Sequence, residues 1–192
     1  KAALHLGAPG LPVVDLIHDA PAFDPKSSAF LLAALAQEFP PGAVFLSIVD
    51  PGVGTDRRAL VVAAGGQWFV GPDNGLFAIL VRRGGAAVRA WEITWRPTRL
   101  TASFHGRDLF APIAAEIART GTFGGAPKGM EIDPGSVDRT DFPDEFGGII
   151  YIDAYGNAIS GLRAENLSPN DRIMVHNVEI KGETTFASVP EG

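Results

Sequence analysis

The stretch 43-AVFLSIVDPGVGTDRR-58 decides the fold, and the rest of the chain is organised around it. Its first half, Ala43–Val49, is an apolar run typical of a buried strand. This run ends at Asp50, and a loop with one proline and two glycines then leads to Arg57 and Arg58. A carboxylate at the end of a parallel strand lies where open α/β sheets bind their ligands, and glycines let the backbone approach a bound group closely. The stretch therefore predicts an α/β sheet with a ligand-binding loop at its edge.

The segments around this stretch alternate between strand and helix character. Leu11–Ile17 is predicted to be a strand, and Ser27–Phe39 a helix that ends at two prolines. A strand–helix–strand order indicates parallel strands. Farther along, Gly65 and Gly66 separate two apolar runs as in a β-hairpin. Further strands are expected over Ala59–Ala64, Gln67–Val70 and Ala87–Ile93, and helices over Leu76–Arg83 and Leu109–Arg119.

The character of the sequence changes after Gly121, where Gly, Pro and Asp become frequent. We predict an N-terminal α/β domain over 1–126, a linker over 127–147 and a small β-rich, barrel-like domain over 148–192. The expected fold class is α/β, with a mostly parallel sheet flanked by helices and an all-β C-terminal part. In that part, Gly148–Asp153 and Arg172–Ile180 are expected to be strands.

Composition excludes several classes of function. The chain has 192 residues, 46% of them hydrophobic and 20% charged, with a net charge of −6 and no cysteine. The acidic balance argues against a nucleic-acid partner, and the lack of cysteine excludes disulfides and thiolate-bound metals. Because no apolar run approaches the roughly 20 residues of a membrane span and no signal peptide is visible, we expect no membrane partner and a cytoplasmic location.

Two further loops combine polar side chains with glycine. The loop 71-GPDNG-75 follows a predicted strand, although its residues are also those of an ordinary β-turn. His105, in 103-SFHGRD-108, precedes a predicted helix, where free backbone N–H groups can bind a water or an anion. We interpret His105 as functional and Asp108 as a structural helix cap.

The C-terminal part contains one motif, 151-YIDAYGN-157. Asp153 and Asn157, beside Tyr155, have the groups to bind an amino group and a base edge, or to form a β-turn with the tyrosine packed. The remaining histidines lack such a context and are interpreted as structural or surface residues: His5, His18 and His176.

A divalent-metal site is not expected. Asp50, Asp73, His105 and Asp108 carry suitable donor atoms. However, no pair among them has a fixed helical spacing that would favour metal binding.

Together, four motifs resemble the S-adenosyl-L-methionine (SAM) hydrolases that form adenosine, also called SAM hydroxide adenosyltransferases, which are related to fluorinase and chlorinase. The motifs are 49-VDPGVGTDRR-58, 69-FVGPDNG-75, 104-FHGRDLFAP-112 and 152-IDAYGN-157, and they follow one another in the order of the family. The early segment 13-VVDLIHDAP-21 is similar as well.

The resemblance implies that the chain splits SAM with water into adenosine and L-methionine, with SAM as substrate and no cofactor. It implies catalytic roles for Asp50, Arg57 and His105. It also implies a homotrimer in which SAM binds between the N-terminal domain of one subunit and the C-terminal domain of the next.

The same resemblance implies the residues that bind the substrate. Asn157 is similar to the residue that binds adenine, and Asp153 to the residue that holds the methionine amino group. Tyr155 belongs to the same binding motif, and Phe23 corresponds to an aromatic residue that lies against the nucleoside.

The chemistry of SAM agrees with these residues independently of the resemblance. Its sulfonium leaves without being protonated, so an enzyme must supply an oriented, desolvated nucleophile in line with C5′. The Asp50 carboxylate is able to accept a proton from water, while Arg57 and His105 are able to hold the developing hydroxide. Whether Asp50 or His105 accepts the proton stays open at this point.

Two alternatives are kept beside the hydrolase: a SAM-dependent halogenase, and a non-catalytic module that binds adenosine or SAM. The Asp50 carboxylate would repel a halide ion. Halogenating relatives carry neutral residues at the positions of Asp50 and His105, which favours the hydrolase here.

Two features of the family have no counterpart in the sequence. The family's first strand ends in TDFG, whose acid binds the ribose hydroxyls, and Lys1–Pro12 contains no such motif. Further adenine and methionine contacts of the family lie beyond the position of Gly192. We therefore expect a chain that is incomplete at both ends, with a SAM pocket that lacks part of its contacts.

Overall fold

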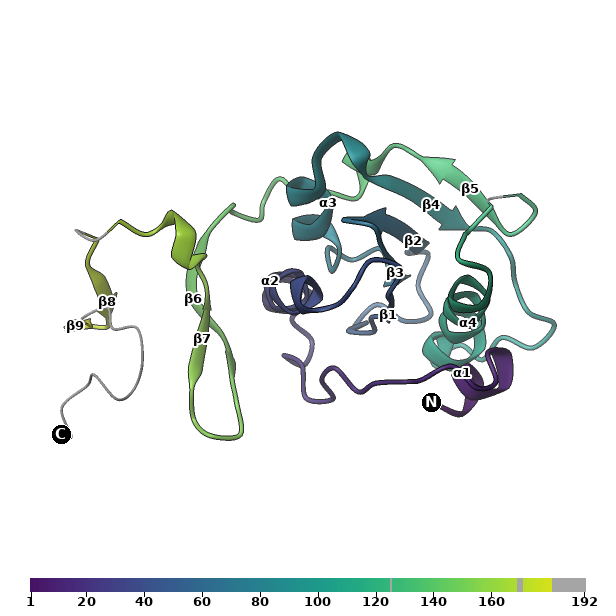
Figure 1. Ribbon diagram of the computed structural model, residues 1–192, viewed down its shortest axis with the longest axis horizontal. Helices are drawn as coiled ribbons and strands as arrows, with labels where there is room; N and C mark the ends of the chain where they lie inside the picture. Colours follow the sequence, from purple (N-terminus) through teal and green to yellow (C-terminus); the bar gives the residue numbers. More distant parts are fainter. Residues whose placement is uncertain (125, 169–170, 181–192) are drawn as a thin grey trace. The chain divides into compact units, whose positions relative to one another are not determined.

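The computed structural model describes residues 1–124, 126–168 and 171–180. The chain divides into two compact units, Lys1–Gly161 and Leu162–Gly192. The first unit contains a five-stranded sheet flanked by helices (Figure 1), and the predicted α/β class is thus confirmed. The predicted domain limits at 126 and 148 do not coincide with this division and stay a prediction.

The sheet has the strand order β1-β3-β2-β4-β5. β1 pairs with β3 in parallel, whereas the three other ladders are antiparallel. Parallel pairing is therefore confined to one ladder, although the sequence predicted it for most of the sheet. The strands are β1 (Val44–Leu46), β2 (Ala59–Ala64), β3 (Gln67–Pro72), β4 (Arg89–Ile93) and β5 (Gly129–Ile132).

The hairpin predicted at Gly65 and Gly66 is confirmed. Both glycines have positive φ, 60° and 76°, as the tight turn between two antiparallel strands requires. The turn sets β2 against β3 in register from Ala59 opposite Pro72 to Ala64 opposite Gln67. This direct connection accounts for the antiparallel pairing of β2 with β3.

Leu11–Ile17, predicted to be a strand, belongs to no ladder in the described part of the chain. Pro12 has no N–H to donate, which weakens a run of residues as a strand. The segment and β1 line a common cavity of about 440 Å³. The apolar run was therefore insufficient, because a strand also needs a neighbour within hydrogen-bonding distance.

Residues 127–147, which the sequence predicts to be a linker, contain one strand of the sheet. Gly129–Ile132 forms β5 and pairs with β4, from Gly129 opposite Ile93 to Ile132 opposite Ala90. Only Gly129 of this strand is buried. An edge strand with so little buried apolar surface leaves almost no hydrophobic signal in the sequence.

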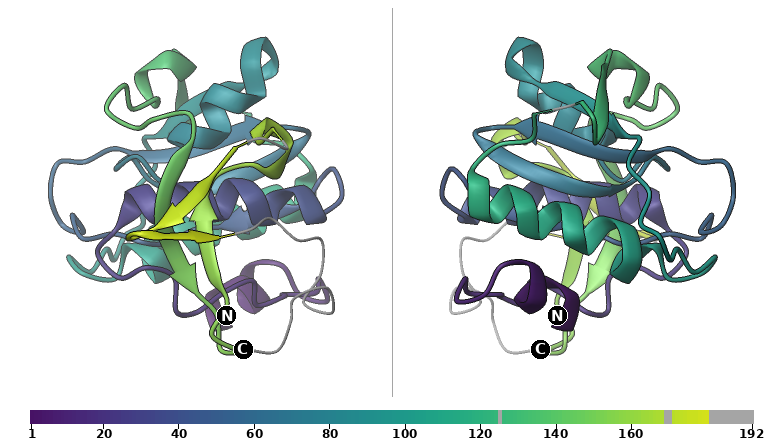
Figure 2. Two further views of the ribbon diagram at one scale, coloured as in Figure 1. Left: turned by 90° about the vertical axis from the view of Figure 1, so that its left-hand side faces the viewer. Right: turned by 90° about the vertical axis from the view of Figure 1, so that its right-hand side faces the viewer.

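Helices cover both faces of the sheet. α2 (Pro25–Leu35) and α3 (Ala78–Gly84) lie on one face, while α4 (Ala111–Thr120), with α1 (Ala2–Gly7) beside it, lies on the other (Figures 1 and 2). Helices can pack on both faces because alternate side chains of a strand, as in β2, point to opposite faces of the sheet. Leu60 and Val62 pack with α2 and α3, and Val61 packs with α4. Within the described residues, no helix combines the length and the apolar character that crossing a membrane requires.

The C-terminal part is built from β-hairpins. In the first unit, β6 (Phe146–Ile152) pairs with β7 (Ala158–Gly161), and Phe146 stacks on Phe30 of α2 with 5.7 Å between ring centroids. In the second unit, β8 (Ile173–Val175) pairs with β9 (Val178–Ile180). The single strand predicted over Arg172–Ile180 is therefore a hairpin, which turns at His176 with a φ of 54°. A barrel-like closure of the C-terminal part stays a prediction.

Candidate active site

Asp50 and Arg57 form a buried ion pair at the end of β1. Pairing with β3 continues past β1, since Ser47 N donates to the Val70 carbonyl at 3.0 Å, and Asp50 follows three residues later. Arg57 Nε donates to Asp50 Oδ1 at 2.8 Å, and Arg57 Nη2 donates to Oδ2. The two side chains are only 9% and 6% exposed. Two parallel bonds between a guanidinium and a carboxylate fix both groups in one plane.

The Arg57 guanidinium is also held from two other sides. Its Nη1 donates to the Arg58 carbonyl at 3.2 Å, and its central carbon lies 5.2 Å from the centre of the Phe110 ring. A cation over an aromatic face is attracted to the negative π-surface. Sequence reasoning missed Phe110, although it lies within the motif 104-FHGRDLFAP-112.

His105 completes this group from a distant part of the sequence. It directly precedes a π-helical turn, Gly106–Phe110, which continues into α4. Its Nδ1 lies 3.2 Å from Arg57 Nη2. Because an arginine can only donate, Nδ1 must accept, and we assign the proton of the neutral ring to Nε2 from this contact.

The surroundings of His105 keep its ring neutral. Burial lowers the pKa of His105 below 6.5, and the charges of Arg57 and Arg96 act in the same direction. The carboxylates of Asp50 and Asp108 oppose this shift without reversing it. At neutral pH the ring therefore presents an Nε2–H donor rather than a second cation.

Asp108 is structural, but it does not cap the helix as predicted. Its side chain accepts from the Thr101 backbone N–H at 3.0 Å, and Arg107 Nε donates to it at 2.6 Å. These bonds hold the pKa of Asp108 far below its usual range. Asp108 therefore fixes the loop that leads into His105.

A cavity of about 250 Å³ opens beside Arg57 and His105, and Arg96, Glu92 and Arg58 also line it. Sites that bury a drug-sized ligand usually measure about 300–1,000 Å³. The cavity is thus large enough for water and a small group, but small for a whole nucleoside with an amino-acid chain.

The acids considered as metal ligands each have an arginine partner. Asp50 pairs with Arg57, Asp73 with Arg58 and Asp108 with Arg107. Across the described ranges, no three His, Cys, Asp or Glu side chains gather in a group suited to a metal ion.

The second predicted group, Asp153 and Asn157, lies in the turn between β6 and β7. Asp153 Oδ1 accepts from the backbone N–H groups of Tyr155 at 2.8 Å and of Asn157 at 2.9 Å. Asn157 Nδ2 donates to Asp153 Oδ2 at 2.8 Å. These bonds lower the pKa of Asp153, with the Asn157 side chain as the largest cause. Asp153 therefore stays a carboxylate, and Asn157 keeps its Oδ1 as an acceptor.

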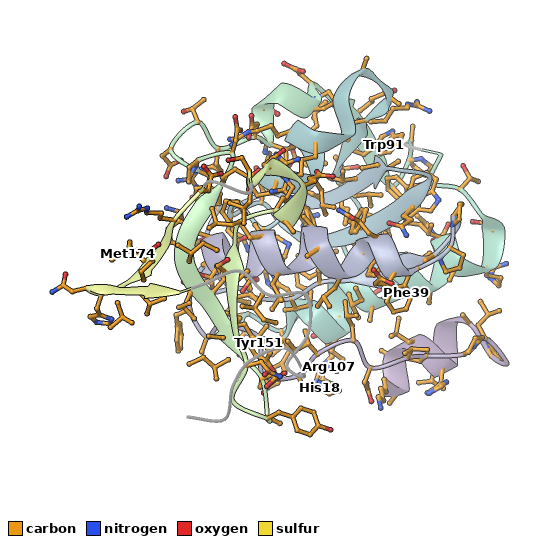
Figure 3. The ribbon with its side chains drawn as sticks, turned by 60° about the vertical axis from the view of Figure 1, so that its left-hand side comes forward. His18, Phe39, Trp91, Arg107, Tyr151 and Met174 are labelled. Atoms are coloured by element: carbon orange, nitrogen blue, oxygen red, sulfur yellow. The ribbon has the colours of Figure 1, made fainter. Side chains whose placement is uncertain are left out.

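Two aromatic side chains among the predicted binding residues are exposed. Tyr155 is 93% exposed, and Phe23, with a φ of 59°, is 83% exposed. Tyr151 OH donates to Asp19 at 3.0 Å and so ties β6 to the loop before α2. Figure 3 shows Tyr151 beside His18, the neighbour of Asp19. The predicted site residues thus form two groups, and within the described residues no hydrogen bond joins Asp153, Tyr155 or Asn157 to the Asp50 group.

A family model and related sequences place the chain in one family. The family model of the SAM hydroxide adenosyltransferase N-terminal domain matches residues 1–126. The (R)-S-adenosyl-L-methionine hydrolase of Thermus thermophilus is 38% identical, with 100% of this chain and 78% of the relative covered. The hydrolase of the same name from Salinispora arenicola is 37% identical over 96% of this chain and 74% of its own. The crystal structure of an uncharacterized conserved protein from Thermotoga maritima superimposes with a TM-score of 0.80 at 25% identity, covering 98% of this chain and 78% of that one.

Proposed function

This chain belongs to the SAM hydroxide adenosyltransferase family, and we propose that it hydrolyses SAM to adenosine and L-methionine. The observation that carries the proposal is the meeting of Asp50, Arg57 and His105. Arg57 and His105 are 48 residues apart in the sequence, yet their side chains lie within hydrogen-bonding distance beside a cavity. A carboxylate that can accept a proton and a neutral imidazole that can donate a hydrogen bond are the groups needed to orient and deprotonate a water.

In the proposed mechanism, one water attacks C5′ of SAM in line with the sulfonium. His105 Nε2–H donates to the water oxygen, because its Nδ1 is occupied by Arg57. Asp50 takes the proton as the C–O bond forms, since each carboxylate oxygen keeps a lone pair beside its bond to Arg57. The C5′–S bond breaks with its electron pair going to sulfur, which yields a neutral thioether in methionine. Asp50 then releases the proton to solvent.

Arg57 acts by holding the other two groups. Its guanidinium bonds the Asp50 carboxylate and the His105 ring at once, so the proton acceptor and the water-binding donor have fixed directions before SAM arrives. Such preorganisation avoids reorientation during the reaction and is a large part of electrostatic catalysis.

The turn at Asp153 supplies groups suited to the two ends of SAM. The Asp153 carboxylate fits the methionine ammonium, and Asn157 Oδ1 fits the amino group of adenine. We further propose that a homotrimer places this turn against the Asp50 group of a neighbouring subunit. The small cavity beside His105 and the exposure of Tyr155 and Phe23 support such a shared site. The cytoplasmic location stays a prediction from the sequence.

Hydrolysis in water enriched in ¹⁸O tests this proposal directly. Incubation with SAM should yield adenosine and methionine in equal amounts, with ¹⁸O in the 5′-hydroxyl of adenosine. The variant Asp50→Ala should lose at least roughly 100-fold in rate. Absence of ¹⁸O from the 5′-hydroxyl of adenosine, or full activity in Asp50→Ala, would contradict the mechanism.

The same incubation decides between the hydrolase and the two alternatives. Formation of 5′-chloro-5′-deoxyadenosine in chloride, without adenosine, would identify a halogenase instead. Calorimetric binding of adenosine by a protein that shows no turnover would identify a binding module.

A further inference from the structure

The loop 71-GPDNG-75 has no role in the mechanism above, yet it touches the chain directly before Asp50. Asn74 Nδ2 donates to the Val49 carbonyl at 2.7 Å, and its Oδ1 accepts from the Leu76 N–H at 3.3 Å. The two contacts require opposite ends of the amide, so they fix its orientation. Asn74 therefore holds the backbone at the point where β1 passes into the Asp50 loop.

Asp73, the preceding residue, holds the other end of the same loop. Arg58 Nε donates to Asp73 Oδ2 at 2.6 Å, and the Asp73 N–H donates to the Arg58 carbonyl at 3.1 Å. That carbonyl also accepts from Arg57 Nη1 at 3.2 Å. The Asp73 N–H and the Arg57 guanidinium, which pairs with Asp50, thus share the Arg58 carbonyl as their acceptor.

Between these two anchors, the hydrogen bonds of the loop are local. Thr55 donates to the Gly52 carbonyl from its backbone N at 3.1 Å and from its hydroxyl at 2.7 Å, and Val53 N donates to the Asp50 carbonyl at 3.3 Å. Pro51 and residues 54–56 are exposed. Because the loop interior is largely exposed, the separation of its ends depends on the Asp50–Arg57 bonds together with the anchors at Val49 and Arg58.

We propose that Asn74 and Asp73 are positioning residues that hold Asp50 and Arg57 at bonding distance and thereby keep His105 in register with them. The proposed role in catalysis rests on the proposed function, whereas the geometric role does not. The segment 71-GPDNG-75 reaches both ends of the Asp50 loop because it lies at the end of β3, the parallel neighbour of β1.

The chain offers a matched control in Gln67, at the opposite end of β3. Its Nε2 donates to the carbonyls of Ala36 at 2.9 Å and Phe39 at 2.7 Å. Like Asn74, it is a side-chain amide that ties β3 to a neighbouring segment. At about 3.3 Å per residue the two amides are roughly 20 Å apart, so Gln67→Ala removes a similar bond far from the site.

We would compare Asn74→Ala, Asp73→Asn and Gln67→Ala for kcat, KM and thermal unfolding. Asn74→Ala should lower kcat roughly 10- to 100-fold, because small displacements of reacting groups have effects of this size, with KM little changed. Gln67→Ala should lower the unfolding temperature and keep kcat. Asp73→Asn keeps the shape of the side chain and serves if Asn74→Ala does not fold; it should also lower kcat. Unchanged kcat in a folded Asn74→Ala or Asp73→Asn protein would overturn the proposal.

A double-mutant cycle separates positioning from a general loss of stability. If Asn74 acts through the contact between Asp50 and Arg57, adding Asn74→Ala to Arg57→Lys should cost little beyond Arg57→Lys alone, because residues that act as a unit are not additive. If the double variant instead loses activity by the product of the two single-variant factors, the proposed connection is contradicted.

Titration of His105 by NMR gives a readout that needs no activity. The charged groups around this ring are Arg57, Arg96, Asp50 and Asp108. A loosened loop exposes the ring and moves the Arg57 charge away, so the pKa of His105 should rise in Asn74→Ala and stay unchanged in Gln67→Ala. Absence of hydrolysis by the wild-type protein would refute the proposed function, whereas an unmoved His105 titration in Asn74→Ala would refute the positioning role.

Discussion

Arg57 donates to both carboxylate oxygens of Asp50, and one of the two donating nitrogens also lies 3.2 Å from Nδ1 of His105. One guanidinium therefore fixes two neighbours. It holds both oxygens of the Asp50 carboxylate, and it takes the lone pair of His105 Nδ1 so that Nε2 carries the proton of the imidazole.

Arg57→Lys should reduce kcat by roughly 100-fold or more, because an ammonium cannot bond both carboxylate oxygens and the imidazole in one plane. Steady-state assays of adenosine release measure the effect. Arg89→Lys is the matched control: Arg89 makes the same two-bond contact with Glu131, but that pair is more than half exposed and does not line the cavity beside His105. Equal losses in the two variants would contradict the role given to Arg57.

The stability of the protein should decrease as pH falls below 6.5. Burial and Arg57 lower the pKa of His105 in the folded state, so below its ordinary value of 6.5 the unfolded chain binds a proton that the folded chain does not. The contribution is complete above pH 6.5 and is lost progressively towards the folded-state pKa. Urea denaturation between pH 5.5 and 7.5 measures it, and His105→Gln should remove this component of the slope. A slope that is unchanged in His105→Gln would show that other groups cause it.

The catalytic activity of the wild-type protein should also fall as the pH drops below 6.5. A protonated His105 ring cannot accept from Arg57, and its added charge disturbs the ion pair. Because the pKa of His105 is lowered, kcat should stay level at neutral pH and fall only below 6.5. An acid limb centred above 6.5 would indicate that another group controls the rate.

Two inactive variants should restore activity when they share an oligomer. If a site uses Asp50 of one subunit and Asn157 of its neighbour, co-expressed Asp50→Ala and Asn157→Ala chains in equal amounts should form about a quarter of their sites with both residues intact. Each variant alone should be weak, Asn157→Ala chiefly through a raised KM. Mixed preparations that are no more active than the separate variants would place each site within one chain.

Gly71→Ala should lower the free energy of unfolding by about 1–3 kcal/mol or more. A Cβ at this position would lie 2.3 Å from the Ser47 carbonyl oxygen and 2.9 Å from the Phe77 ring, so β3 would have to move away from the chain after β1. Gly147→Ala in β6 is the control, since a Cβ there meets nothing within 4 Å. Urea denaturation of both variants measures the difference. If Gly71→Ala and Gly147→Ala have comparable free energies of unfolding, β3 and the chain after β1 tolerate separation.

Much of the architecture follows from local sequence. The paired glycines at 65 and 66 predict the β2–β3 hairpin because both adopt positive φ at little cost. α2 begins at Pro25, two residues before the start predicted at Ser27, and the Asp24 side chain caps it by accepting from Ser27 N at 3.0 Å. Segments such as β5 were missed because their order depends on a partner strand rather than on their own apolar residues.

The sequence by itself determined the α/β class, the hairpin and the polar motifs at the ends of strands and helices, since turn conformation and burial periodicity are local properties. Only the tertiary structure decided which motifs meet. It brought His105 to Arg57 across 48 residues, placed Asn74 on the Val49 carbonyl and kept the Asp153 turn in a group of its own. The physical reason is that a hydrogen bond depends on distance and direction between atoms, and these follow from the packing of β1 against β3 and of α4 against the sheet.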